Sequence, residues 1–263
     1  MTIRHVMSFL LGVLLTAAVA GLLWWRVEDS PQRLRTRLLE APEFLADHPE
    51  ILSAAHAVLQ SRALASQGSE RAELIRTKWQ SLVHVAFTPT LGRTDAPLVL
   101  LEFTDYTCEP CRASAHALSE TLGANPDVRV AILLLPTGGA LAEYAARVAL
   151  AAYRQNPEQF SELHELLLSP SEPLTQNSIL AAVAKLGFDI EQIERETASD
   201  ESRRYFSQVR MFAEDMHISG VPAFAMNEQL VLGGVTSAQL ATMVQAARRT
   251  QAATESLLVE GAQ

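Results

Sequence analysis

Two apolar runs on either side of an amphipathic segment constrain the fold of this chain more than any other feature. Leu98–Phe103 (LVLLEF) and Asp127–Leu135 (DVRVAILLL) are both nearly continuous in apolar residues. Such runs are typical of central strands that are covered on both faces of a sheet. A helix is expected between them, from near Cys108 through Leu122. Strand, helix and strand in this order predict two parallel strands in a βαβ unit, and therefore an α/β fold.

The only two cysteines of the chain stand where the first of these strands gives way to the helix, as Cys108-Glu109-Pro110-Cys111. At a helix N-terminus the first sulfur meets unpaired backbone N–H groups and the positive end of the helix dipole, which both favour the thiolate. Pro110 lacks an N–H, which costs little in a first turn, whereas the charge of Glu109 disfavours a neighbouring thiolate. We predict a redox-active pair in which Cys108 attacks and Cys111, one turn further on, resolves the mixed disulfide.

Other uses of the cysteine pair stay open at this point. Cys108 and Cys111 could bind a metal such as copper, or the domain could be a non-catalytic scaffold. A Cys₄ zinc site is excluded, because four cysteines are not available within the chain. The net charge of −9 argues against a nucleic-acid partner, because such proteins usually present a basic patch. Thiol–disulfide exchange needs no cofactor, neither metal nor flavin nor nicotinamide, because electrons pass directly between sulfurs.

The amino terminus carries a membrane signal. Val6–Trp25 is uncharged over twenty residues, and a helix of that length spans about 30 Å, which matches the hydrocarbon core of a bilayer. The Trp24-Trp25 pair closes the run, and indole rings favour the level of the lipid headgroups. We interpret residues 1–29 as a membrane anchor; the alternative is a cleaved signal segment, because Ala18-Val19-Ala20 is an acceptable cleavage site.

The rest of the chain divides into a helical arm, a redox domain and a tail. Residues 30–82 have a helical pattern and form the arm, which serves either as a spacer or as an oligomerisation surface. The redox domain covers residues 83–250, with a helical insertion at about 140–216, and residues 251–263 form the tail. Helix breaks are expected in the arm at His48-Pro49 and at Gln67-Gly68-Ser69.

Within the redox domain, the pattern predicts a short strand, a turn-rich loop, a block of helices, a hairpin and a last helix. The strand is expected at Val83–Phe87 and the loop at Thr88–Pro97. The remaining elements are the helices 145–153, 157–168, 176–186, 189–197 and 201–216, the hairpin strands 223–226 and 229–232, and a helix from Ser237 to about Arg249.

From about Gly92 to Arg249 the sequence resembles the DsbA-like branch of the thioredoxin superfamily. The resemblance rests on LVLLEFTDYTCEPC, on the helical block that follows LLLP, and on ISGVPAF. It implies a thioredoxin fold with an inserted helical domain. It also implies a thiol–disulfide oxidoreductase that acts on protein thiols or disulfides together with a redox partner protein, in an oxidising compartment such as a bacterial periplasm.

The same resemblance assigns further residues to the site. It implies a cis Val221–Pro222 bond opposite the cysteines, which would present the Val221 backbone to an extended substrate strand. Glu102 stands six residues before Cys108, where the family often has a buried acid that could relay the Cys111 proton; a solvated edge position is the alternative. Val221 resembles the oxidase type. The arm resembles that of copper-sensitivity suppressor C proteins, which oligomerise through it, and this keeps an isomerase function open.

Several other residues receive a structural interpretation. Asp105 and Tyr106 are expected to shape the site rather than to react, and His164 is expected to be structural. His116 lies too far along the helix to pair with Cys108 and is expected in packing or at the surface. The methionines at 211, 216 and 226 are expected to fill the core.

Overall fold

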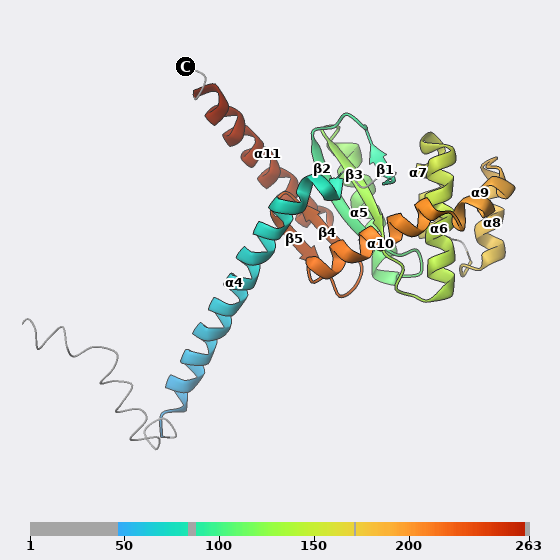
Figure 1. Cartoon of the computed structure of the whole chain (residues 1–263). Coiled ribbons are helices and arrows are strands. Elements are labelled where there is room, and N and C mark those ends of the chain that lie inside the picture. The colour runs from blue at the N-terminus through green and yellow to red at the C-terminus, as the bar shows by residue number, and fades with distance from the viewer. Residues whose placement is uncertain (1–46, 84–87, 171, 261–263) are drawn as a thin grey trace, which may run out of the picture. The chain divides into compact units, whose positions relative to one another are not determined.

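The computed structural model describes residues 47–83, 88–170 and 172–260. The chain divides between Ser66 and Gln67 into two compact units, and the second, Gln67–Gln263, contains the sheet and the cysteine pair. The sheet has the strand order β1-β3-β2-β4-β5 in the described part of the chain (Figure 1). The predicted membrane segment Val6–Trp25 lies outside the described residues. Among the helices that the structure describes, none is both long and apolar enough to cross a bilayer.

The predicted βαβ unit is confirmed. β2 (Leu98–Thr104) and β3 (Val128–Leu134) pair in parallel, and α5 (Glu109–Ala124) connects them. Every residue of β2 is buried, as expected for a strand that is covered on both faces. β4 (Ala223–Met226) pairs antiparallel with β2, and β5 (Gln229–Leu232) pairs antiparallel with β4. β2 is therefore a central strand, and its C-terminal end leads directly into the cysteine pair.

The hairpin is confirmed with the predicted bounds, whereas the segment before β2 differs from the prediction. The expected loop at Thr88–Pro97 contains a strand, β1 (Thr90–Gly92), which pairs antiparallel with β3. Val83 is the last residue of a helix rather than the first of a strand, and residues 84–87 lie outside the described part.

A block of helices lies between β3 and β4. They are α6 (Ala140–Gln155), α7 (Pro157–Leu168), α8 (Gln176–Lys185), α9 (Ile190–Thr197) and α10 (Asp200–Asp215). Figure 1 shows α6 to α9 gathered to one side, away from β4 and β5. α10 returns to the sheet, where the hydroxyl of Tyr205 donates to the carbonyl of Ile132 in β3 and accepts from the N–H of Leu134.

Three helices are longer than predicted. α6 (Ala140–Gln155) extends beyond the expected 145–153 at both ends. α4 (Pro49–Val83) begins after the expected break at His48, but it runs without interruption through Gly68, so the second predicted break is wrong. A lone glycine costs only about 1 kcal/mol relative to alanine inside a helix, which a long helix tolerates. α11 (Ser237–Glu260) continues well past Arg249, so most of the predicted tail is helical.

Candidate active site

Cys108 caps the N-terminus of α5. Its backbone is extended (φ −84°, ψ 118°), and its Sγ accepts a hydrogen bond from the N–H of Cys111 at 3.2 Å. An N-cap acceptor satisfies one of the free donors of the first turn, and here that acceptor is a sulfur. The predicted position of the sulfur against the helix N-terminus is therefore confirmed.

The two cysteines form a disulfide with unequal exposure. Their Cα atoms lie 5.2 Å apart. Cys111 is completely buried, whereas Cys108 is partly exposed. Because a substrate thiolate must reach the sulfur that it attacks, only Cys108 is open to another polypeptide.

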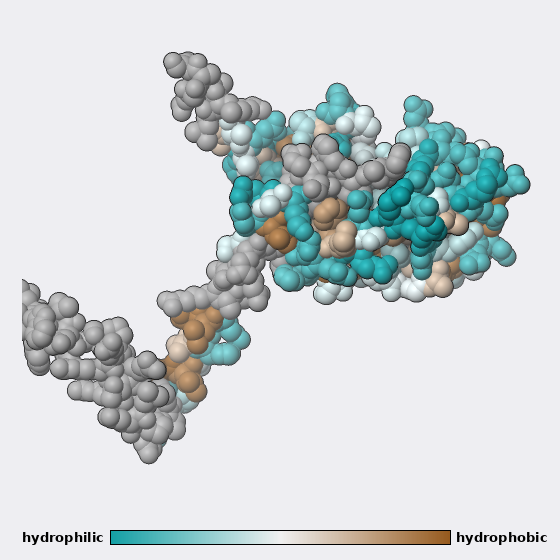
Figure 2. Space-filling view, viewed as in Figure 1, coloured by the Kyte–Doolittle hydropathy of each residue, from teal (hydrophilic) through white to brown (hydrophobic). Residues whose placement is uncertain are grey.

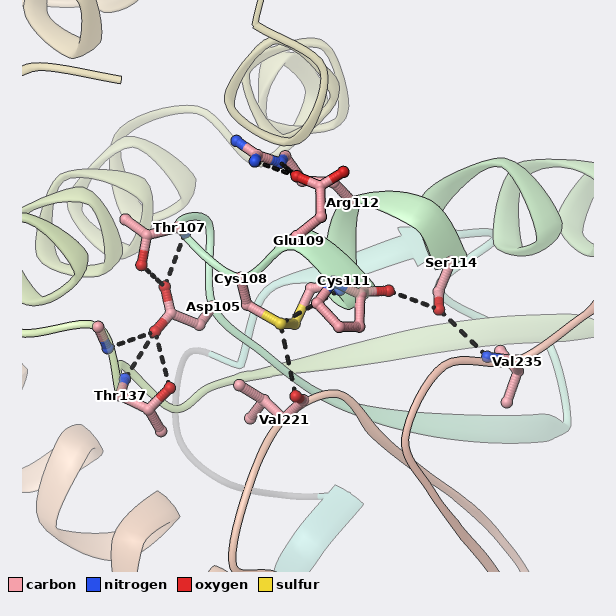
Figure 3. Close-up of a disulfide and its surroundings, with 12 residues drawn as sticks. Asp105, Thr107, Cys108, Glu109, Cys111, Arg112, Ser114, Thr137, Val221 and Val235 are labelled. Carbon is pink, nitrogen blue, oxygen red and sulfur yellow. Dashed lines mark hydrogen bonds and ion pairs between the residues drawn. A yellow bond between two sulfur atoms is a disulfide. The ribbon is translucent and has the colours of Figure 1, made fainter. Parts of the chain in front are cut away.

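The loop before β4 faces this exposed sulfur. The Val221–Pro222 bond is cis, as the resemblance implied. The carbonyl oxygen of Val221 lies 3.4 Å from the Sγ of Cys108. Figure 3 shows Val221 directly beside the disulfide, with Glu109 on the other side of Cys108. A backbone group thus stands next to the reacting sulfur, where an extended substrate chain could pair with it.

Glu109 has a partner that the sequence analysis did not identify. Its carboxylate forms an ion pair with the guanidinium of Arg112, one helical turn further on (Figure 3). The spacing of three residues on a helix is the signal that could have revealed this pair. Since Arg112 partly offsets the charge of Glu109, the acid opposes a Cys108 thiolate less than its position alone suggests.

Pro110 and Ser114 connect the first turn of α5 to the loop before α11. The hydroxyl of Ser114 donates to the carbonyl of Pro110 at 3.0 Å and accepts from the N–H of Val235 at 3.2 Å (Figure 3). The turn that carries the disulfide is therefore held from a second element, which limits how far the two sulfurs can separate.

Asp105 anchors the loop that enters the active site. One carboxylate oxygen accepts the N–H and hydroxyl of Thr107, and the other accepts the N–H groups of Thr137 and Gly138 and the Thr137 hydroxyl. Burial alone would raise the pKa of Asp105, but these hydrogen bonds outweigh it and the pKa is lowered. Gly138 is required here, because a Cβ at that position would overlap the Thr107 hydroxyl. Asp105 shapes the site, as predicted, by joining the loop before Cys108 to the loop after β3.

Tyr106 anchors the same loop to the helical block. The Tyr106 hydroxyl and the Nδ1 of His164 are hydrogen-bonded at 2.9 Å, and both residues are buried. Burial lowers the pKa of His164 to about 4, so the imidazole is neutral at physiological pH. The structural interpretation of His164 is consistent with this position.

Glu102 is buried on the central strand. It is completely inaccessible and lies between Ile132 of β3 and Phe224 of β4, so the alternative of a solvated edge is wrong. Within the described residues neither carboxylate oxygen has a hydrogen-bond partner, and the buried hydroxyl of Thr104 is likewise unpartnered. Burial raises the pKa of Glu102 from the ordinary value of 4.5 to about 7.

The remaining predictions on single residues concern His116 and three methionines. His116 is an exposed surface residue that pairs with Glu120 at 3.2 Å. Met216 and Met226 fill the core as expected, whereas Met211 is 51% exposed. Over the part of the chain that the structure covers, no three His, Cys, Asp or Glu side chains gather in a way that could hold a metal ion.

Comparison with known proteins identifies the family. A periplasmic thioredoxin-like protein of Salmonella enterica serovar Typhimurium is 30% identical, with a TM-score of 0.59 over 64% of this chain and 93% of that one. ScsC of Proteus mirabilis in a transitional conformation is 26% identical, with a TM-score of 0.61 over 82% of this chain and 96% of that one. The disulfide bond formation protein D of Bacillus subtilis is 22% identical over 54% of this chain and 69% of its own length.

Another curated relative is much longer than this chain. The Na(+)/H(+) antiporter NhaA 3 of Salinispora tropica is 28% identical over 52% of this chain, and the match spans only 21% of the antiporter. The model of the DSBA-like thioredoxin domain matches residues 99–245, which include the cysteine pair, the helical block and the loop at Val221. The chain therefore belongs to the DSBA-like thioredoxin domain family and is a thiol–disulfide oxidoreductase.

Proposed function

We propose that this enzyme oxidises pairs of thiols in protein substrates. A substrate thiolate attacks the Sγ of Cys108; the Cys108–Cys111 bond breaks, and Cys111 leaves as a thiolate. The second substrate thiolate then attacks the substrate sulfur of this mixed disulfide and releases the Cys108 thiolate. Two electrons pass from the substrate to the cysteine pair, and a redox partner protein removes them again. In the reverse direction Cys111 resolves a mixed disulfide held on Cys108.

The observation that carries this proposal is the position of Cys108 at the start of α5. Its Sγ accepts the N–H of Cys111 and lies at the positive end of the helix, and both stabilise the thiolate that oxidation of a substrate releases. A better stabilised leaving thiolate makes the disulfide more oxidising. Val221 before the cis-proline supports the same direction, because it resembles the oxidase type.

Equilibration of the purified protein with glutathione tests the direction of electron flow. We expect a reduction potential between about −180 mV, as in protein disulfide isomerase, and about −120 mV, as in the strongly oxidising type, because Glu109 opposes part of the helix effect. The Glu109→Gln variant is the matched control and should be more oxidising than the wild type. A potential near that of thioredoxin, about −270 mV, would overturn the oxidase proposal.

The arm favours isomerisation as a second candidate function, since isomerases of this superfamily commonly work as oligomers. In α4, Ile51, Leu52, Val58 and Leu59 are between 42% and 63% exposed, and they form two pairs that are seven residues apart. Figure 2 shows hydrophobic surface, coloured brown, on this part of α4. A spacing of seven is typical of helices that associate with one another. We propose that a second copy of the chain covers this surface.

We also propose that the chain is anchored in a membrane by Val6–Trp25, with the redox domain in the periplasm or another extracytoplasmic compartment. The uncharged run has the length of a bilayer span. A cysteine pair that works as a disulfide fits an oxidising compartment, and the Salmonella relative is described as periplasmic.

One experiment on the full chain tests anchor and arm together. We expect the protein in the membrane fraction, and we expect it to be oligomeric by light scattering after extraction in detergent. Leu52→Glu combined with Leu59→Glu should give a monomer that is still in the membrane fraction, because a charge is costly in an apolar interface. Ala57→Glu combined with Gln60→Glu, on the opposite side of α4, is the matched control and should stay oligomeric. A monomeric wild type would contradict the arm proposal, and a wild type in the soluble fraction would contradict the anchor.

A further inference from the structure

A hollow of about 340 Å³ lies between α5 and α7, close to the active-site turn. The residues of α5 that line it recur every three or four positions, and so do those of α7, so two helix faces form most of its walls. Leu91 and Gly92 of β1 complete the lining. It stays open because small residues, Ala115, Ser119 and Ser161, stand on these walls. The apolar side chains that line it include Leu118, Leu122 and Leu168.

The hollow reaches Arg112, four residues after Cys108 in the first turns of α5. Arg112 lines it and is paired with Glu109, the residue that follows Cys108. A neighbouring hollow of about 550 Å³ shares Arg112 and reaches Glu109 itself. From Arg112 to Leu122 the helix rises about 15 Å, which is the length of four or five extended residues.

His164 adds a buried polar group to this lining. It is only 4% exposed, and its Nδ1 is hydrogen-bonded to Tyr106. No described residue is hydrogen-bonded to its other ring nitrogen, and the side chain lines the hollow. A neutral imidazole has one donor and one acceptor nitrogen, so the second nitrogen can bind a peptide N–H or carbonyl group.

We propose that the hollow between α5 and α7 binds the unfolded substrate polypeptide next to its reacting cysteine, with an apolar side chain of that segment inside it. The inference rests on the proposed function. A substrate polypeptide that is joined to Cys108 through its own cysteine continues on both sides of that cysteine. Val221 lies on one side of Cys108 and Glu109 on the other (Figure 3), so one flank passes the Val221 backbone and the other enters the hollow.

The charges around the hollow favour a neutral or basic segment. Arg112 is paired with Glu109, and His116 is paired with Glu120. Glu165 is exposed at the rim, and among the described residues its carboxylate has no ion-pair or hydrogen-bond partner. The Glu165 carboxylate would repel an acidic segment, whereas it would attract basic side chains and leave apolar ones unaffected.

Peptide dithiols test the proposal on the full-length oxidised protein. One pair of peptides carries either Leu or Ser four residues before the cysteines, and a second pair carries Leu or Ser four residues after them. Acid quenching and thiol labelling give the second-order rate constant for reduction of the enzyme disulfide, with dithiothreitol as a substrate without flanks. We expect the wild type to prefer Leu over Ser about tenfold on one flank, as for an apolar side chain in a partly open pocket.

Filling the hollow should remove this preference. In Ser119→Trp, and in Ala115→Leu as a second variant, the Leu peptide should react as slowly as the Ser peptide, while the rate with dithiothreitol stays within about twofold of wild type. Ala124→Trp, on the exposed last residue of α5 and outside the hollow, is the control and should keep the preference. Equal rates for Leu and Ser on both flanks in the wild type, or a preference that survives Ser119→Trp, would overturn the inference. A wild-type disulfide that does not react with dithiothreitol would instead overturn the proposed function.

Discussion

Cys108→Ser is expected to reduce the oxidation of a reduced, unfolded protein to the uncatalysed rate. In Cys111→Ser the Cys108 thiolate can attack a disulfide of an oxidised protein substrate, which releases one substrate thiolate and should accumulate mixed disulfides. The reason is the unequal exposure of the two sulfurs, because Cys108 is partly exposed and Cys111 is completely buried. Without Cys108, no accessible sulfur can accept a substrate thiol. Without Cys111, a disulfide between Cys108 and a substrate has no resolving thiol. Non-reducing gels and mass spectrometry of the trapped species measure both effects.

The two variants are controls for each other. Both lack the Cys108–Cys111 bond, so any stability that the disulfide provides is lost equally in each. A difference between them must then come from the position of the remaining thiol. Mixed disulfides on Cys108→Ser rather than on Cys111→Ser would reverse the proposed roles. Tight stoichiometric metal binding by the reduced wild type, with little thiol exchange, would support the metal-binding alternative.

The features of this site that could be predicted from the sequence are those that depend on residues close together in the chain. One short segment of the sequence contains the apolar runs of β2 and β3, the four residues from Cys108 to Cys111, and the helix that follows them. The resemblance added the cis bond at Val221, which lies far along the chain from Cys108. Apolar patterning and helix N-terminal chemistry depend on neighbouring residues, so sequence reasoning finds them.

The parts that could not be predicted depend on contacts between distant segments. Asp105 is bound by Thr137 and Gly138, and nothing in the local sequence around Asp105 shows where those donors lie. β1 has only three residues and is defined by its pairing with β3, so its turn-rich composition predicted a loop. The hollow between α5 and α7 likewise exists only because two helices meet at small residues.

Glu102 should make the stability of the oxidised protein fall as the pH rises from about 4.5 to above 7. Burial raises the pKa of this carboxyl from 4.5 to about 7 in the folded state. Between these values the folded protein keeps a proton that the unfolded chain has released, so unfolding becomes more favourable as the pH increases. A gap of about 2.5 in pKa corresponds to about 3 kcal/mol in the free energy of unfolding.

Glu102→Gln isolates this contribution, because the amide has a similar shape and does not titrate. We expect the free energy of unfolding of the variant, relative to wild type, to increase by about 3 kcal/mol between pH 4.5 and pH 8. Denaturant unfolding of the disulfide form measures it, since disulfide-bonded cysteines do not titrate. Thr121→Val, which removes a buried hydroxyl on α5, is the control and should give a difference that does not depend on pH.

The same substitution tests whether Glu102 relays the proton of Cys111, as we propose. A buried carboxyl with a pKa near 7 can take up and release a proton close to neutral pH, as a general base for Cys111 requires. Glu102→Gln should therefore slow the attack of Cys111 on a mixed disulfide by about a hundredfold at pH 7. The attack of the Cys108 thiolate of the reduced enzyme on a small disulfide, in which Cys111 takes no part, should keep its rate. Stopped-flow release of a small thiol from Cys108 separates the two steps. An equal slowing in Thr121→Val would show that packing of the core, rather than proton transfer by Glu102, controls the resolving step.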